Sequence, residues 1–125
     1  MEIGFECSCD GFGCDDVARY NHVRLFAPAE DIALLKDPNE KVISKKDVVL
    51  VYKYPLTKQV SVPHSSEDGF DREKLIRTVS DDYHRFYRDE PDLIQKNGYK
   101  SEWEYLVLMR VKPIDDNTYE VRVEV

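Results

Sequence analysis

The chain has 125 residues, a hydrophobic share of 42% and a charged share of 34%, which are typical of one globular domain and exclude a disordered chain. Its formal net charge of -7 argues against general binding to nucleic acid, because phosphate contacts need a surplus of Lys and Arg. No apolar run is as long as a membrane span, and the N-terminus lacks a signal-peptide pattern, so we expect a cytoplasmic protein without membrane contact.

The N-terminal segment holds the three cysteines, Cys7, Cys9 and Cys14, in a stretch punctuated by glycines. An odd number of closely spaced cysteines fits a reducing compartment better than a disulfide framework. Together with His22 they supply the thiolates and imidazole that a tetrahedral zinc prefers, so a structural zinc site is one hypothesis. Free thiols are the alternative, because a single residue between Cys7 and Cys9 is a tighter spacing than usual.

Residues 15–46 are expected to form short elements only. Residues 16–26 fit either a helix or, at Val23–Phe26, a short strand. Pro28 followed by Glu30 and Asp31 predicts a short helix, since proline suits its first turn and acids suit its positive end. We therefore expect residues 1–46 to be a loop and helical layer within a single domain, 1–125, whose core is formed by residues 47–125.

Two hairpins are predicted for this core. The run Val48–Tyr52 lacks alternation, as in a strand covered on both faces, and Gln59–Val62 returns beside it before Pro63. A second hairpin joins residues 106–112 to residues 119–125 through a turn at 115–117.

One long helix is predicted between the hairpins, from Gly69 to Glu90. Asp71 is placed to cap its start, and Pro91 ends it. The polar residues between its apolar positions, Asp81 and Asp82 among them, are interpreted as facing water. The apolar stripe at helical spacing consists of Leu75, Ile76, Val79, Tyr83, Phe86 and Tyr87. The order ββαββ then predicts an α+β fold, a four-stranded antiparallel sheet with the long helix packed across it.

Several motif positions follow one another between residues 48 and 125. An apolar strand is followed by Gly-Phe-x-Arg-x-x-Leu at residues 69–75, by helix aromatics, and by a closing Tyr-x-Val-x-Val at residues 119–123, with Tyr83, Tyr87, Trp103, Leu106 and Leu108 between. This pattern resembles an uncharacterised α+β module of large DNA viruses of protists, of algae and of plants. The resemblance implies no activity, but it implies a viral or virus-like source, and thus a place in a virion or host cytoplasm.

No catalytic residues are assigned. His64 and His84 lack a nucleophile near them in sequence, and the acidic pairs at 15–16, 81–82 and 115–116 are interpreted as a cap, a helix surface and a turn. A thiol enzyme is a further hypothesis, since Cys14 precedes a possible helix start, whose dipole favours a thiolate.

The leading interpretation is a non-catalytic domain that binds a protein partner. The chain has eight tyrosines and one tryptophan, residue types that are enriched at interfaces. Those near the ends of elements are predicted to contact the partner, namely Tyr54, Tyr99, Trp103 and Tyr105. The alternatives are a small zinc-binding domain with Cys7, Cys9, Cys14 and His22 as ligands, and a hydrolase or thiol enzyme without local motifs. The sequence does not indicate an oligomeric state.

Overall fold

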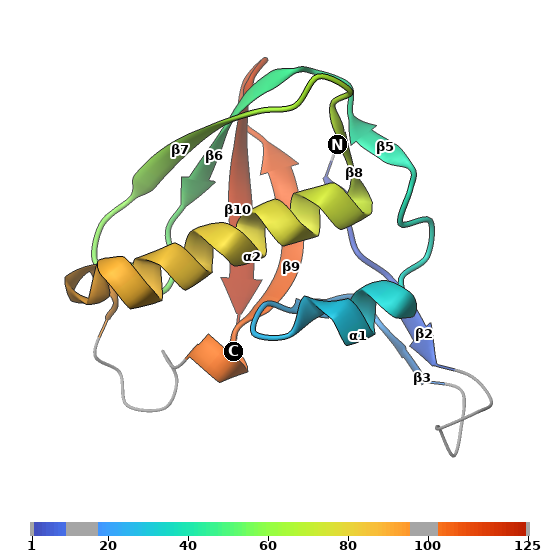
Figure 1. The fold of residues 1–125 in the computed structure, drawn as a ribbon, viewed down its shortest axis with the longest axis horizontal. Helices are drawn as coiled ribbons and strands as arrows, with labels where there is room; N and C mark the ends of the chain where they lie inside the picture. The colour runs from blue at the N-terminus through green and yellow to red at the C-terminus, as the bar shows by residue number, and fades with distance from the viewer. Residues whose placement is uncertain (1, 10–17, 96–102, 125) are drawn as a thin grey trace.

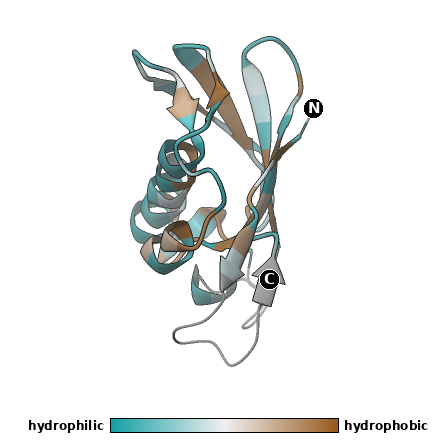
Figure 2. Cartoon of the chain, turned by 90° about the vertical axis from the view of Figure 1, so that its right-hand side faces the viewer, coloured by the Kyte–Doolittle hydropathy of each residue, from teal (hydrophilic) through white to brown (hydrophobic). Residues whose placement is uncertain are grey.

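The computed structural model describes residues 2–9, 18–95 and 103–124, and its centre is a six-stranded sheet (Figure 1). The strand order is β1-β9-β10-β6-β7, and β4 also pairs with β9. The strands are β1 (Ile3–Gly4), β4 (Val23–Arg24), β6 (Asp47–Tyr52), β7 (Val60–Ser65), β9 (Val107–Pro113) and β10 (Thr118–Glu124). Helices α1 (Pro28–Ala33) and α2 (Arg72–Asp89) lie on the same side of this sheet (Figure 2).

Smaller elements surround this sheet. β2 (Cys7–Cys9) pairs with β3 (Ala18–Tyr20), and β5 (Lys41–Ile43) pairs with β8 (Phe70–Asp71), which leads directly into α2. The short 3-10 helices η1 (Pro91–Leu93) and η3 (Trp103–Tyr105) follow α2. Gly69, before β8, has a φ of 75° and lies against the backbone of β5, so a side chain there would be strained and would clash.

The predicted fold class, α+β with a four-stranded antiparallel sheet in ββαββ order, is wrong. The protein is mostly β, and its sheet is mixed, because β10 runs parallel to β6. β1 and β4, from the segment expected to form loops and helices, extend the sheet beyond the hairpins by pairing with β9. Strands of two residues show no alternation, and the relative direction of two hairpins is not encoded in the pattern of either one.

The two predicted hairpins and the capped long helix are confirmed, but Pro63 does not end the strand as expected, because β7 continues through it to Ser65. β6 pairs antiparallel with β7, and β9 with β10. The side chain of Asp71 caps α2 by accepting a hydrogen bond from the backbone N–H of Lys74 at 2.7 Å. In the N-terminal part, the short strand at Val23 and the helix beginning at Pro28 are also present.

The core lies between α2 and the sheet. Three buried rings, those of Tyr52, Tyr83 and Phe86, pack edge to face with centroid distances of 5.1 to 5.8 Å. The buried arc of α2 is wider than one apolar stripe, since it includes Ser80 and Asp82. Ser80 donates a hydrogen bond to the carbonyl of Leu25 at 2.8 Å, so α2 also packs against the segment between β4 and α1.

Candidate functional site

Trp103 is at the centre of an aromatic cluster formed by η3, α2 and the segment after β4. Its ring centroid lies 4.5 Å from that of His84, 5.5 Å from Tyr87, 6.3 Å from Tyr83 and 6.4 Å from Phe26. We call these five residues the Trp103 cluster. Rings at such distances and inclined to one another attract each other beyond their burial of apolar area.

Backbone hydrogen bonds place the parts of the Trp103 cluster side by side. The N–H of Leu25 donates to the carbonyl of Leu106 at 3.1 Å, and the N–H of Leu106 donates to the carbonyl of Trp103 at 3.2 Å. Phe26 is thereby held next to η3. On α2, positions 83, 84 and 87 share one side of the helix, and Tyr83 continues into the core through Tyr52. The cluster is therefore anchored to the core at one end.

The other end of the cluster reaches the surface. Phe26 is 53% exposed, and Tyr105, on the same short helix as Trp103, is 50% exposed. Burial raises the phenol pKa of Tyr83 and of Tyr87, so both rings are neutral near pH 7. The indole Nε1–H of Trp103 is buried and has no hydrogen-bond partner within the described ranges. The result is a largely aromatic surface whose rim faces solvent.

The residues predicted to contact a partner fall into three groups. Trp103 is the centre of this cluster, and Tyr105 is exposed two residues after it on η3. Tyr54 adjoins the Trp103 cluster, since its backbone carbonyl accepts a hydrogen bond from the Tyr83 hydroxyl at 2.7 Å, and it also lines a hollow of about 390 Å³ on the sheet. Tyr99 is outside the described residues. The predicted contact with a partner remains a prediction for all four.

Sequence reasoning missed the other members of the Trp103 cluster. The sequence pattern leaves Phe26 in an ambiguous segment and predicts that His84, a polar residue of the long helix, faces water. His84 is exposed, but its ring also packs on Trp103. Tyr83, His84 and Tyr87 share one side of a helix that the sequence predicts, and this spacing could have indicated an aromatic cluster.

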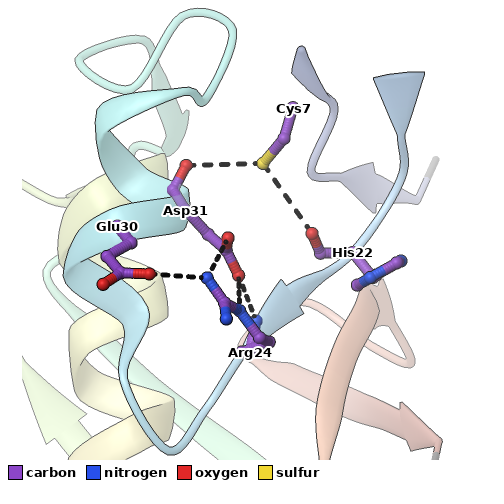
Figure 3. Close-up of polar contacts among 5 residues, drawn as sticks. All are labelled: Cys7, His22, Arg24, Glu30 and Asp31. Atoms are coloured by element: carbon purple, nitrogen blue, oxygen red, sulfur yellow. Dashed lines mark hydrogen bonds and ion pairs between the residues drawn. The ribbon is translucent and has the colours of Figure 1, made fainter. Parts of the chain in front are cut away.

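A second arrangement, centred on a buried carboxylate, joins β4 to α1 (Figure 3). Asp31 is 2% exposed, and its carboxylate accepts hydrogen bonds from Nε and Nη2 of Arg24 at 3.0 Å each and from the backbone N–H of Arg24 at 2.8 Å. Its hydrogen bonds and its charge raise the pKa of the Arg24 guanidinium. Glu30 lies beyond, 3.1 Å from Nη2 of Arg24. The charge of Asp31 is therefore neutralised by a paired cation.

Cys7 lies next to this pair. Its side chain is fully buried, and the thiol donates to the backbone carbonyls of Asp31 at 3.4 Å and His22 at 3.7 Å. Burial first, and then the charges of Asp31 and Glu6, raises the thiol pKa from 9.0 to about 11. Cys7 is therefore protonated at neutral pH, in a setting that does not favour a nucleophilic thiolate.

The zinc hypothesis stays a prediction. Cys14 and the side chain of Cys9 lie outside the described residues. Figure 3 shows the carbonyl of His22 facing Cys7, with the imidazole directed away from that thiol. Within residues 2–9, 18–95 and 103–124, no group of three or more His, Cys, Asp or Glu side chains is arranged to hold a metal ion. Coordination by Cys7 would require its thiol to ionise and to leave its two carbonyl partners.

A third arrangement crosses from α2 to the sheet. The interpretation of Asp82 as a helix surface residue is wrong, since Asp82 is 2% exposed. Its Oδ2 accepts a hydrogen bond from the hydroxyl of Tyr52, and lies 2.6 Å from Nε2 of His64. Nη2 of Arg85 is 3.4 Å from Oδ1. His64 thus has an acidic neighbour 18 residues away in the chain, which local sequence could not reveal.

Asp82, Arg85, Tyr52 and His64 form what we call the Asp82 network, which connects α2 to β6 and β7. An aspartate that orients a histidine is one part of many hydrolytic sites, but such a site also needs a nucleophile and a hollow for substrate. The two hollows described, of about 540 Å³ beside β1 and about 390 Å³ on the sheet, have neither His64 nor Asp82 in their walls.

The larger hollow is lined by three acidic and three basic residues among others, and its cations are paired with acids. Arg72 contacts Glu40 at 2.6 Å, and Arg110 contacts Glu2 at 2.8 Å. Lys36 is 4.0 Å from Glu6. The hollow therefore lacks the surplus of one charge that would favour an ionic ligand.

Comparisons with known proteins identify no family for the chain. No family model matches it, and no solved structure matches it significantly. The chain is similar to an uncharacterised membrane protein of Ostreococcus tauri, with 36% identity over 74 residues. The match covers 56% of this chain but 14% of that protein. In the described part of this chain, no helix combines the length and the apolar character needed to cross a bilayer. The resemblance to the viral and algal module stays a prediction.

Proposed function

We propose that the chain is a non-catalytic domain that binds a protein partner through the Trp103 cluster and Tyr105. The observation that supports this proposal is the exposure of Phe26, 53%, whose ring packs on Trp103, together with that of Tyr105, 50%, two residues after Trp103. Aromatic residues are enriched at interfaces, and the residues that dominate binding are large rings supported from below by packed neighbours. The Trp103 cluster has this composition and this support.

The free edge of the sheet is less suited to a partner. β7 is an edge strand, and Pro63 pairs with Val49 near its middle. The N–H of Val49 donates to Asn117, on the β10 side, at 2.8 Å, so the pair of Val49 and Pro63 is not a hydrogen-bonded one. The backbone nitrogen of Pro63 thus belongs to the outer edge, where it offers no donor. Proline at this place opposes the addition of another strand.

The buried polar groups favour a non-catalytic function. The thiol of Cys7 is protonated and enclosed, and both buried carboxylates, Asp31 and Asp82, are engaged within the fold. A hydrolase or thiol enzyme that used one of these three described groups would need that group to face a substrate.

Photo-crosslinking tests the proposal, because the chain supplies a matched control. Phe26 and Ile114 are both 53% exposed, but Ile114 lies in the turn between β9 and β10. A photoreactive phenylalanine analogue at position 26 or 105 should crosslink one defined protein in an extract of the source cells. The same analogue at position 114 should not.

The captured protein, once purified, should bind the chain directly. Phe26→Ser and Tyr105→Ser should each weaken this binding by about tenfold or more, as expected for truncation of central interface rings, while Ile114→Ser leaves it unchanged. Equal crosslinking from positions 26 and 114, or equal affinities of the three variants, would refute the proposal.

A further inference from the structure

Two exposed acidic residues adjoin members of the Trp103 cluster in the chain, and the described residues give them no ion-pair partner. Asp81 lies one turn before His84 on α2, and Glu104 lies between Trp103 and Tyr105 on η3. Both side chains are exposed, and neither makes an ion pair with any other described residue. Carboxylates spaced this way around aromatic rings form a surface on which negative charge and ring faces are adjacent.

Among the described residues, the cations near this surface are already bound by acids. Arg88, which follows Tyr87, makes two hydrogen bonds to Asp89, at 2.9 and 3.0 Å. Arg24, two residues before Phe26, holds Asp31 and Glu30. Among the described residues, the charge available at this surface is therefore that of Asp81 and Glu104. The net charge of the whole chain, -7, has the same sign.

From this arrangement we infer that the Trp103 cluster binds a cationic segment of a partner protein, one that presents arginine or lysine beside apolar side chains. The inference rests on the proposed function and specifies the chemistry of the partner. A guanidinium or ammonium group is attracted to an aromatic ring face, and a nearby carboxylate strengthens its binding. Complementary charge also steers the encounter and selects against acidic segments.

Trp103 allows this inference to be measured without a label. It is the single tryptophan of the chain, so its fluorescence reports directly on the cluster. The probes are two short peptides of repeated glycine, arginine and leucine, identical except that citrulline replaces every arginine in the second. Citrulline keeps the shape of arginine and removes its charge.

The arginine peptide should bind at least about tenfold more tightly than the citrulline peptide at low salt, and added salt should reduce that difference because exposed charges are screened. The double variant Asp81→Asn/Glu104→Gln should lose most of the difference. The matched control, Asp68→Asn/Asp116→Asn, removes the same amount of charge from exposed positions on other loops and should retain it.

Three outcomes would overturn the inference: equal binding of the two peptides, no binding of either, or an equal loss of affinity in the two double variants. The last would mean that only the total charge of the chain matters. Each is distinguishable from failure of the proposed function, which depends on the crosslinking difference between positions 26 and 114. A partner captured at position 26 that binds independently of Asp81 and Glu104 would leave the proposed function intact and refute the cationic segment.

Discussion

Asp31 on α1 and Asp82 on α2 are both 2% exposed, yet the fold satisfies them in different ways. Asp31 is paired with Arg24, seven residues earlier in the chain, through hydrogen bonds to both carboxylate oxygens. Asp82 relies on the hydroxyl of Tyr52 and the ring of His64, from two strands of the sheet. The first is a charge pair formed locally, and the second is a hydrogen-bond network formed by tertiary structure.

The two sites connect different parts of the fold. Arg24 is itself half-exposed, so the Asp31 pair lies at the margin of the fold and fixes the entry into α1. The Asp82 network lies within the interface between α2 and the sheet, next to the rings of Tyr83 and Phe86. Removal of one partner from the charge pair should therefore cause a large loss in the free energy of unfolding. Removal of one donor from the Asp82 network should cause a smaller loss, because other donors remain.

The largest effect is expected at the charge pair. Arg24→Met removes the cation and leaves a buried carboxylate, which should lower the free energy of unfolding by about 2–3 kcal/mol, somewhat less than for a fully enclosed pair because Arg24 is half-exposed. Urea unfolding measures this loss. Arg88→Met is the control, since the pair of Arg88 and Asp89 is on the surface and its removal should leave the urea midpoint unchanged. Equal shifts in both variants would contradict the assigned role of Asp31.

The second prediction concerns Cys7, which lies next to Asp31 and should make the stability of the protein depend on pH. The thiol pKa of Cys7 is raised from 9.0 to about 11, so the folded state favours the protonated thiol. Its contribution to stability is complete below pH 9.0 and is lost as the pH rises towards 11, on the order of 2 kcal/mol in total. Urea unfolding with reductant present at several pH values measures this loss.

The variant Cys7→Ser distinguishes the loss of stability caused by ionisation of the Cys7 thiol from the loss caused by other titrating groups. The phenol pKa of Tyr52 is also raised by burial, so some stability is lost in alkaline solution in any variant. Serine does not titrate in this range, so the variant should show a flatter decline between pH 9 and 11. If both proteins lost stability in parallel, the thiol of Cys7 would not be held in its protonated form by the fold.

The two carboxylates also show how far the sequence could predict this structure. The apolar stripe predicted α2 and its buried face from Leu75 to Phe86, because that face packs on a sheet. It did not predict burial of Ser80 or Asp82, because α2 packs on its flanks against further segments, which supply partners for polar groups. A polar residue beside an apolar stripe is buried only where tertiary structure satisfies it, and a local pattern does not carry that information.

The same limit applies to the candidate site. Trp103 and Tyr105 were predicted from residue type and from their place near the end of an element. Phe26 joins them only because the N–H of Leu25 bonds to the carbonyl of Leu106, a contact between segments about 80 residues apart. The short strand β1 escaped prediction for the same reason, and β4 was only one of two alternatives for its segment, since pairing with β9 rather than their own pattern makes them strands.

The smallest effects are expected in the Asp82 network. Tyr52→Phe keeps the buried ring and its packing but removes one donor to Asp82, which should lower the free energy of unfolding by about 1–2 kcal/mol. His64→Gln should cost less, about 0.5–1 kcal/mol, because the His64 side chain is 21% exposed and the glutamine amide can still donate to the carboxylate. Urea unfolding of both variants and of their combination measures the coupling between the two donors.

The coupling decides whether Asp82 is served by a network or by two separate hydrogen bonds. Both donors share Oδ2, so loss of one leaves the other as the main protection of a carboxylate that is 2% exposed. The double variant should then lose at least about 0.5 kcal/mol more than the sum of the single losses, since the second removal leaves the buried charge with Arg85 alone at 3.4 Å. Strict additivity would show that water or a shifted Arg85 replaces each donor independently. In that case the Asp82 site would behave like the Asp31 site at the edge of the fold, and not like a cooperative network within the core.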